Sequence, residues 1–231
     1  MLDVADLDVY HGNSQTLKGM SFSVAPGEVV CLLGRNGAGK TTTLRAIMGL
    51  MRPSAGHVRL DGVELTALAA HEVPRQGIGY VPQGRRLFSE LTVRDNLDIG
   101  LMTRKSPRAV LDEVFDLFPR LQERLDQVSG TLSGGEQQML ATARALCINP
   151  SVILLDEPTE GLMPSMIATI RDVILTLKGR GKAILLVEQR VEAVLSVADR
   201  VCFIENGRVQ ATSPVQALRD DPSMLTRYVG V

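Results

Sequence analysis

Hydrophobic residues in the first 65 positions fall in short segments separated by turn signals. These segments have the length and aliphatic content of β-strands, and they lie near residues 2–9, 19–24, 28–33 and 57–65. Asp61-Gly62 stands between VRL and VEL, which is a strong short-range signal for a β-hairpin. Pro26-Gly27 marks a second turn. The pattern predicts an antiparallel β lobe at the N-terminal side of the chain.

From about residue 92 to residue 148 the hydrophobic spacing becomes helical. Thr92 stands where a helix N-cap is expected, with an acidic residue three positions later. The segment RAVLDEVFDLF places its apolar residues on one broad helical face, namely Val110, Val114, Phe115, Leu117 and Phe118. We therefore expect a helical insertion subdomain over about 92–148.

After residue 150 strand-like and helical segments alternate. SVILLD, KAILLV and RVCFI are almost continuously apolar, as are strands that are buried on both faces. Helical patterns begin after Pro164 and near residue 190, and Asn206-Gly207 indicates one more hairpin. The expected fold class is α/β with a mostly parallel sheet. Since the chain shows no repeat, low-complexity run or obvious linker, we expect a single domain over residues 1–231.

Composition excludes several classes of protein. The 231 residues carry 25 Lys and Arg against 26 Asp and Glu, for a net charge of −1. Proteins that coat nucleic acid are usually basic, so no nucleic-acid partner is expected. No run of about 18 apolar residues occurs, and the N-terminus lacks the basic region of a secretory signal. The three cysteines form no CxxC pair, which argues against a disulfide framework and a thiolate zinc site.

Residues 34–41, GRNGAGKT, match the phosphate-loop pattern G-x-x-x-x-G-K-[ST]. Glycines let successive backbone N–H groups turn toward one anion, and a following helix adds the positive end of its dipole. Lys40 is expected to reach the β- and γ-phosphates, and the Thr41 hydroxyl to bind Mg²⁺. A strand pattern before the loop and a helical pattern after it favour this interpretation over a chance glycine turn. The expected phosphate-binding residues are Gly34, Arg35, Asn36, Gly37, Ala38, Gly39, Lys40, Thr41 and Thr42.

Two acidic residues end the apolar strand of SVILLDEP, residues 151–158. Open α/β sheets bind ligands at the carboxyl ends of their strands. Asp156 is expected to hold Mg²⁺ through its water shell, and Glu157 to orient an attacking water. By themselves these residues are equally consistent with two solvated acids, but the upstream phosphate loop favours the functional interpretation.

The sequence LSGGE at residues 132–136 precedes a helix-forming run, QQMLATARAL. Ser133 and the two glycines stand at a second helix N-terminus, which is suited to bind an anion. A serine-capped turn without further function is the alternative. The order of the parts decides between them, because the phosphate loop comes first, LSGGE second and the Asp156-Glu157 strand third.

With these three motifs the chain resembles the nucleotide-binding subunit of an ATP-binding cassette (ABC) transporter, over essentially its whole length. The resemblance implies a P-loop NTPase fold with a RecA-like core. It also implies that Tyr10 stacks on adenine and that Gln83 senses Mg²⁺ and the attacking water. In this family two subunits pair head to tail with ATP and Mg²⁺ between them, so that LSGGE of one faces the phosphate loop of the other. The resemblance therefore adds Ser133, Gly134, Gly135 and Glu136 to the nucleotide-binding residues.

Three stretches suggest a narrower likeness within the family. They are QGRRLFSELTVRDNL at 83–97, VEQ at 187–189 and the TEGL-x-P pattern at 159–164. The first is similar to a stretch in one of the two ATPase subunits of branched-chain (hydrophobic) amino acid importers. The other two are similar to stretches of those importers and also of urea or short-chain amide importers. The implied partners are integral-membrane permease subunits, a second ATP-binding subunit and, indirectly, a solute-binding protein. The implied location is peripheral, at the cytoplasmic face of the inner membrane.

The chain departs from the family's pattern at two positions. Most members carry a histidine where this chain has Gln189, and no histidine follows His71. We expect the Gln189 amide to donate to a phosphate oxygen without bringing a positive charge, or else merely to fill the space. Met163 stands where an aspartate usually couples the two sites of the pair. Glu160 is a nearby acidic residue that compensates in one interpretation.

Arg85, Arg86, Leu87 and Phe88 follow Gln83. In the family this region receives a short helix of the membrane subunit, and an apolar surface with arginines suits an interface. The alternative is a solvated arginine pair with Leu87 and Phe88 in the core. Two other classes of protein remain: a soluble ABC protein, which needs two cassettes or a long coiled-coil insertion, and a P-loop small-molecule kinase, which has an arginine-rich lid and no LSGGE.

Overall fold

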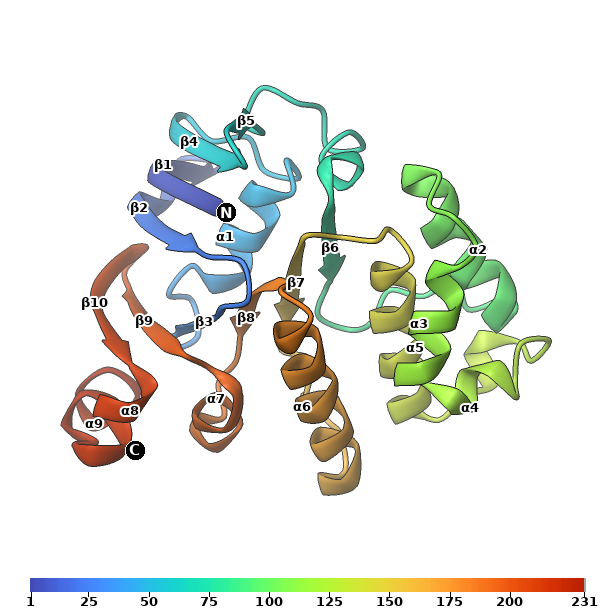
Figure 1. Ribbon diagram of the computed structural model, residues 1–231. Helices are drawn as coiled ribbons and strands as arrows, with labels where there is room; N and C mark the ends of the chain where they lie inside the picture. Colours follow the sequence, from blue (N-terminus) through green and yellow to red (C-terminus); the bar gives the residue numbers. More distant parts are fainter. Residues whose placement is uncertain (231) are drawn as a thin grey trace.

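Two β-sheets and a group of helices make up the computed structural model, which describes residues 1–230 (Figure 1). The smaller sheet is antiparallel and has four strands in the order β2-β1-β4-β5. Its strands are β1 (Leu2–His11), β2 (Ser14–Val24), β4 (Ala55–Leu60) and β5 (Val63–Glu64). The expected hairpin at Asp61-Gly62 joins β4 to β5, and the N-terminal antiparallel lobe is confirmed.

The larger sheet has six strands in the order β10-β9-β3-β8-β7-β6. All neighbours are parallel except β9 and β10, which form the antiparallel hairpin expected at Asn206-Gly207. The strands are β3 (Val29–Leu33), β6 (Ile78–Val81), β7 (Val152–Asp156), β8 (Ala183–Val187), β9 (Arg200–Glu205) and β10 (Arg208–Pro214). The expected mostly parallel α/β core is therefore confirmed.

Alternate residues of the central strands enter two different hydrophobic cores. Val30 and Leu32 of β3 face α1 and the antiparallel sheet, whereas Val29, Cys31 and Leu33 face the long helices. The period of two follows from strand geometry. Because both faces are covered, β3, β7 and β8 are fully buried, which explains their continuous apolar sequences.

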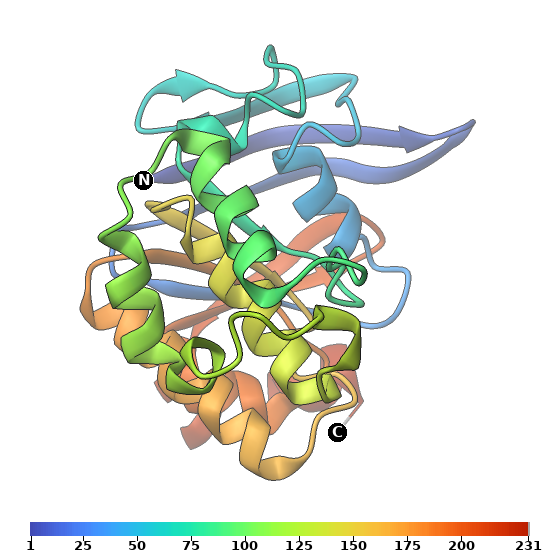
Figure 2. The same ribbon diagram turned by 90° about the vertical axis from the view of Figure 1, so that its right-hand side faces the viewer.

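Helices between residues 93 and 146 form a separate layer, which lies in front of the sheets in Figure 2. The described helices of the chain are α1 (Lys40–Ile47), α2 (Val93–Arg104), α3 (Val110–Leu117), α4 (Pro119–Gln122), α5 (Gly134–Leu146), α6 (Pro164–Gly179), α7 (Val191–Val197), α8 (Val215–Asp220) and α9 (Ser223–Val229), with short 3-10 turns at Pro74–Gln76 and Ser129–Thr131. Within residues 1–230, no helix has both the length and the hydrophobicity needed to cross a bilayer.

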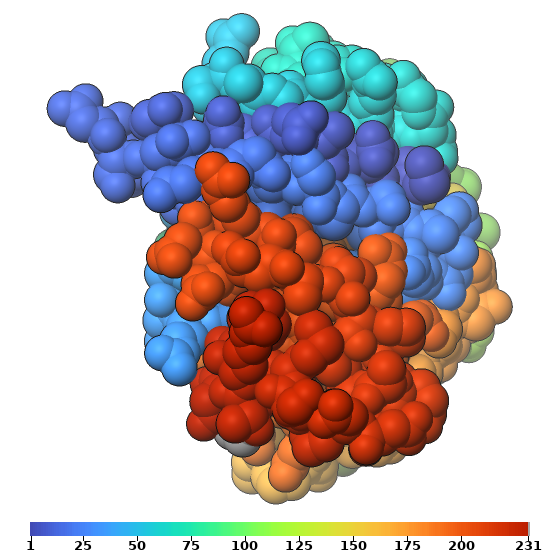
Figure 3. All heavy atoms as spheres, turned by 90° about the vertical axis from the view of Figure 1, so that its left-hand side faces the viewer, coloured from blue at the N-terminus to red at the C-terminus, as the bar shows by residue number. Residues whose placement is uncertain are grey.

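The C-terminal helices α8 and α9 have no counterpart among the sequence predictions. They pack against the edge formed by β9 and β10, where the Tyr228 ring stacks on Phe203 with 5.0 Å between centroids. In Figure 3 this segment covers a large part of one face below the antiparallel lobe. It closes the open side of the hydrophobic core around Phe203, Val215, Leu218 and Leu225.

Candidate active site

The phosphate loop connects β3 to α1, as the sequence predicts. Gly39 has a left-handed backbone (φ 110°), and a Cβ at Gly34 would lie 2.2 Å from the carbonyl oxygen of Ile204. Both positions therefore require glycine. The Lys40 ammonium donates to the carbonyl oxygens of Gly34 (2.7 Å) and Arg35 (3.1 Å). Its burial lowers its pKa, while the charge of Glu157 acts in the opposite direction. The loop thus wraps a buried ammonium group at the start of a helix.

Asp156 ends β7 and lies beside the first turn of α1. Thr41 Oγ1 donates to Asp156 Oδ1 at 3.1 Å, and the Tyr80 hydroxyl lies 3.5 Å from Oδ2. Asp156 is only 1 % exposed, and this burial raises its pKa. Burial also raises the pKa of Tyr80 to about 12. A hydroxyl and a buried carboxylate at contact distance are the oxygen donors that Mg²⁺ accepts from a protein when phosphates and water complete its shell. The pair therefore fits Mg²⁺.

Glu157 is held by two side-chain amides. Gln189 Nε2 donates to one carboxylate oxygen at 2.5 Å, and Gln83 Nε2 lies 3.3 Å from the other. The Glu157 backbone is left-handed (φ 50°), which is uncommon for a residue other than glycine, and its N–H donates to Val187 O at 2.9 Å. Gln83 and Gln189 therefore both lie at the carboxylate that the sequence predicts to be catalytic. The expected donation from Gln189 to a phosphate oxygen remains a prediction.

One pocket collects residues from five separate stretches of the chain. Its lining consists of Thr16, Asn36, Gly37, Gly39, Lys40, Thr41, Thr42, Gln83, Glu157, Glu160 and Gln189. Two of these were not predicted as site residues. Glu160 accepts from Gln83 Nε2 at 3.0 Å, and the sequence marked it only as an acidic residue close to Met163. Thr16 lines the pocket because its strand β2 passes beside the phosphate loop, where a Cβ at Gly39 would lie 3.5 Å from Thr16 O, and no local motif marks it.

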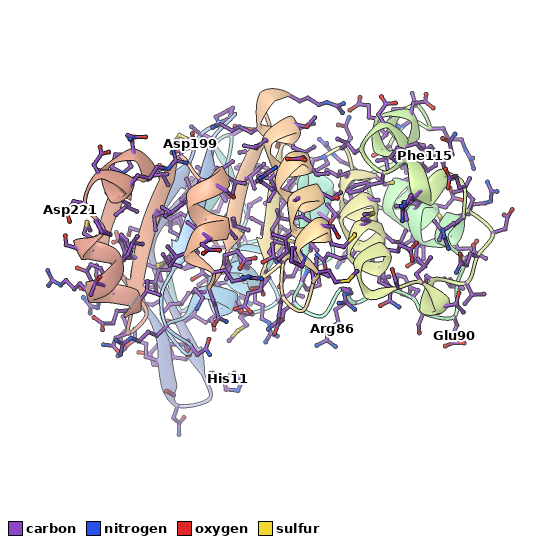
Figure 4. All side chains as sticks on the ribbon, turned by 90° about the horizontal axis from the view of Figure 1, so that it is seen from below. His11, Arg86, Glu90, Phe115, Asp199 and Asp221 are labelled. Atoms are coloured by element: carbon purple, nitrogen blue, oxygen red, sulfur yellow. The ribbon has the colours of Figure 1, made fainter. Side chains whose placement is uncertain are left out.

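Tyr10 and His11 lie at the end of β1, on the hairpin that projects from the lobe (Figure 4 labels His11). Tyr10 is 48 % exposed, so its ring is available for stacking. It does not line the pocket described above, and its adenine contact stays a prediction. His11 lines a neighbouring pocket together with Arg45, Gln83 and Asp156.

The LSGGE segment lies apart from this pocket, at the N-terminus of α5. Ser133 is the N-cap residue: its hydroxyl accepts from the Glu136 N–H at 3.4 Å, and Glu136 Oε2 accepts from Ser133 N at 2.9 Å. The Ser133 hydroxyl also donates to Glu136 Oε2 at 2.7 Å, and this bond, together with the one from Ser133 N, lowers the pKa of Glu136. A Cβ at Gly134 would lie 3.1 Å from Arg85 Nη2. Ser133, Gly134, Gly135 and Glu136 contribute nothing to the lining of the phosphate pocket.

A family model described as ABC transporter matches residues 17–160, which is more than half of the chain. The chain belongs to the ABC transporter ATP-binding family. Its members hydrolyse ATP, and this ABC ATPase carries the phosphate loop, the Asp156-Glu157 strand end and the LSGGE helix in the geometry described above.

Two curated relatives resemble this ABC ATPase over nearly their entire length. It is 43% identical to the high-affinity branched-chain amino acid transport ATP-binding protein BraG of Pseudomonas aeruginosa, with all of both chains covered. It is 34% identical to the lipopolysaccharide export system ATP-binding protein LptB of Haemophilus influenzae, covering 100% of this chain and 97% of LptB. ABC ATPases of an amino acid transport system and of a lipopolysaccharide export system are thus both similar to it.

Solved structures of ABC ATPases share its fold. The structure of an ATP binding subunit of an ABC transporter superposes with a TM-score of 0.86 at 29% identity, covering 97% of this chain and 94% of that one. A dimeric post-hydrolysis structure of the ATP-binding cassette MJ0796, bound to ADP and Pi, has a TM-score of 0.82 at 26% identity. The match covers 93% of this chain and 99% of the MJ0796 chain. The expected P-loop NTPase fold class is confirmed.

Proposed function

We propose that this ABC ATPase energises an importer of branched-chain amino acids. The observation that carries the proposal is the 43% identity to BraG along the full length of both chains, compared with 34% to the exporter subunit LptB. The VEQ and TEGL-x-P stretches support the same assignment. An importer of urea or short-chain amides is the second candidate, because its ATPase subunits carry similar stretches.

Transport by the reconstituted complex tests this proposal. The chain is co-purified with its membrane subunits, placed in proteoliposomes and supplied with the solute-binding protein of the same system. We expect ATP-dependent uptake of labelled leucine, and ATP hydrolysis that leucine stimulates. Uptake of urea without uptake of leucine would replace the proposal by its second candidate. ATP-dependent release of a lipid would overturn the importer assignment.

In the proposed chemistry the residues of the pocket act on the terminal phosphate of ATP. Lys40 and the loop N–H groups bind the β- and γ-phosphates. Thr41 and Asp156 would hold Mg²⁺, with Gln83 beside them, and the bound ion would neutralise charge on the phosphate oxygens. Glu157 orients the attacking water and accepts one of its protons, while the water oxygen forms the new bond to phosphorus and the bond from phosphorus to the ADP oxygen breaks.

Lys40→Ala tests the phosphate-binding role. The substitution removes the only ammonium group that the loop encloses, so we expect MgATP binding to weaken by at least tenfold, which corresponds to about 1.4 kcal/mol. Equilibrium binding of a fluorescent ATP analogue measures the effect. A cooperative thermal unfolding transition is the control for folding, since the variant also loses the bonds from the ammonium to the Gly34 and Arg35 carbonyls. Parental affinity in a folded variant would contradict the assignment.

We further propose that the working unit is a head-to-tail pair, attached to permease subunits at the cytoplasmic face of the inner membrane. The dimeric cassette structure supports the pairing. The LSGGE helix is separate from the phosphate pocket of its own chain, as a partner-facing element would be. Met163, the N-cap residue of α6, is 69 % exposed and is thus available to the partner subunit. The partner is a second copy or a related ATP-binding subunit.

A further inference from the structure

A buried carboxylate next to Gln189 is not assigned to any step above. Glu188 directly follows β8 and is only 3 % exposed. Burying a carboxylate is costly unless hydrogen bonds compensate for the lost hydration. Glu188 Oε1 accepts from the Thr159 hydroxyl at 2.6 Å and from the Thr159 N–H at 3.1 Å. Oε2 accepts from the Gln189 N–H at 3.2 Å.

These bonds join the two loops that carry the catalytic groups. Thr159 lies two residues after Glu157, in the loop that follows β7. Gln189 lies in the loop that follows the neighbouring strand β8, and the two strands pair at Asp156 and Val187. Since the Gln189 amide also donates to Glu157, hydrogen bonds and chain together form a closed ring through Glu157, Thr159, Glu188 and Gln189.

This closed circuit of hydrogen bonds constrains the backbone of Glu157. Its left-handed backbone (φ 50°) is unfavourable for a residue with a side chain and persists only where surrounding contacts enforce it. The Glu157 N–H bond to Val187 fixes one side of this turn. Glu188 fixes the other side, because it accepts from both the hydroxyl and the N–H of Thr159. Without the Glu188 carboxylate, both the turn and the Gln189 backbone lose a buried partner.

We propose that Glu188 is a positioning residue for ATP hydrolysis, which holds the Glu157 turn and the Gln189 loop in register across the ends of β7 and β8. The proposal rests on the proposed catalytic role of Glu157. It adds that the reaction depends on a residue that does not line the phosphate pocket. Glu188 is a hydrogen-bond acceptor, so its amide analogue, which offers one acceptor oxygen in place of two, cannot replace it fully.

Three variants of the full chain test the proposal. Glu188→Gln keeps the shape but converts one acceptor into a donor. Thr159→Val removes the hydroxyl, and Thr159→Ser restores it. A small misplacement of a catalytic group can cost up to about 100-fold in rate. We expect kcat to fall roughly 10- to 100-fold in Glu188→Gln and Thr159→Val, with KM for MgATP changed less than about twofold. Thr159→Ser should retain kcat within about twofold of the parent.

Asp199→Asn is a matched control. Asp199 also joins two parts of the chain through its carboxylate, since Oδ2 accepts from the Val29 N–H at 2.9 Å and Oδ1 binds Lys178 at 2.5 Å. It precedes β9, at the amino ends of the parallel strands, whereas Glu188 follows β8 at their carboxyl ends. Figure 4 shows Asp199 on the side of the molecule away from His11 and Arg86. We expect Asp199→Asn to lower the melting temperature without a selective fall in kcat.

Glu157→Gln, measured in parallel, separates two kinds of failure. If Glu157→Gln hydrolyses ATP at the parental rate, the catalytic role of Glu157 is wrong. If Glu157→Gln is inactive but Thr159→Val keeps the parental kcat, the positioning role of Glu188 is wrong. An equal loss in Thr159→Val and Thr159→Ser, or a rise in KM at constant kcat, would also overturn it. If Glu188→Gln does not fold, the comparison of Thr159→Val with Thr159→Ser still tests the proposal.

Discussion

At the residue scale, Gln189 distinguishes this ABC ATPase from relatives that carry histidine at the same position. The Gln189 amide donates to Glu157 at 2.5 Å and has no titratable proton near neutral pH. A histidine there would change its charge near pH 6.5. The ATP hydrolysis rate of this ABC ATPase should therefore show no pH dependence that arises from this position, in contrast to relatives with a histidine there.

Gln189→His tests this difference. The variant should gain a titration in its ATP hydrolysis rate between about pH 6 and 8, because only the protonated ring carries a positive charge near Glu157. Rates are measured across this range at saturating MgATP. Gln189→Asn, which stays neutral, is the control and should keep the parental profile shape. A histidine variant with the parental profile would contradict the expectation.

The functional residues that belong to one contiguous motif could be predicted from the sequence. Lys40, Thr41, Asp156 and Glu157 were identified because their neighbours in sequence define a strand end or a helix start. Thr16 and Glu188 were missed, and Glu160 was considered only as a substitute for the aspartate absent at Met163. Thr16 and Glu160 nevertheless line the pocket, and Glu188 bonds Thr159 two residues after Glu157. Their roles depend on which strands pair and which loops meet, and a single sequence does not specify those contacts locally.

At the scale of elements, two helices begin with the same capping box but differ in function. Thr92 and Asp95 cap α2, and Ser133 and Glu136 cap α5. Replacing either N-cap residue by alanine should cost about 1 kcal/mol of stability, since one helix N–H loses its acceptor. Only Ser133 belongs to LSGGE, which is proposed to face the partner's nucleotide. Thr92→Ala should therefore keep the parental ATPase rate, whereas Ser133→Ala should reduce it at least tenfold.

Thermal unfolding and ATP turnover of both variants provide the comparison. Equal ATPase losses in Thr92→Ala and Ser133→Ala would show that capping alone explains the effect.

The capping carboxylate of Glu136 also predicts how the stability of the protein depends on pH. Hydrogen bonds from Ser133 lower the pKa of Glu136 below its ordinary value of 4.5, so its stabilisation is present at neutral pH and is lost as the pH falls through the lowered value.

The loop that carries Phe88 is held by its backbone, which leaves the ring free. Asn96 bonds the Phe88 N–H and carbonyl at 3.1 and 3.2 Å, and Ser129 donates to the same carbonyl at 2.8 Å. The ring is 49 % exposed, with the Arg144 guanidinium 5.3 Å from its centre, whereas Leu87 packs against the core. The alternative that both Leu87 and Phe88 lie in the core is therefore confirmed for Leu87 and wrong for Phe88.

Phe88→Ala removes an exposed ring without removing these backbone bonds. We expect it to weaken co-purification with the membrane subunits at least fivefold, because an exposed aromatic residue is a typical interface anchor. ATP binding should stay parental. Leu91→Ala, another exposed apolar residue (37 %) close in sequence, is the matched control. Parental recovery of the membrane subunits with Phe88→Ala would contradict the docking role.

Elements with strong internal patterns were predicted, and elements defined by their surroundings were not. The apolar strands β3, β7 and β8 and the helical layer followed from period and length. β6 was not identified as a strand because only four residues form it. The helices α8 and α9 are six and seven residues long and are stabilised by packing on β9, which no local signal in their sequence reveals.

At the scale of the whole molecule, the two anion-binding elements are separated. The phosphate loop begins α1, between the sheets, and LSGGE begins α5, in the helical layer (Figure 1). In the proposed head-to-tail pair, one face of the chain binds phosphate and another completes the site of the neighbouring subunit. On this proposal two helix N-termini approach one γ-phosphate only when two subunits close, so that ATP is both the substrate and the link between them.

The central claim is that Glu157 drives ATP hydrolysis between paired subunits, and Glu157→Gln tests it most directly. The amide keeps the size of the side chain but no longer accepts a proton. We expect the purified complex to retain MgATP in its paired state, while hydrolysis falls at least 100-fold. Bound nucleotide and turnover are measured on the same sample. ATP hydrolysis at the parental rate would show that Glu157 is not the catalytic carboxylate and would contradict the account.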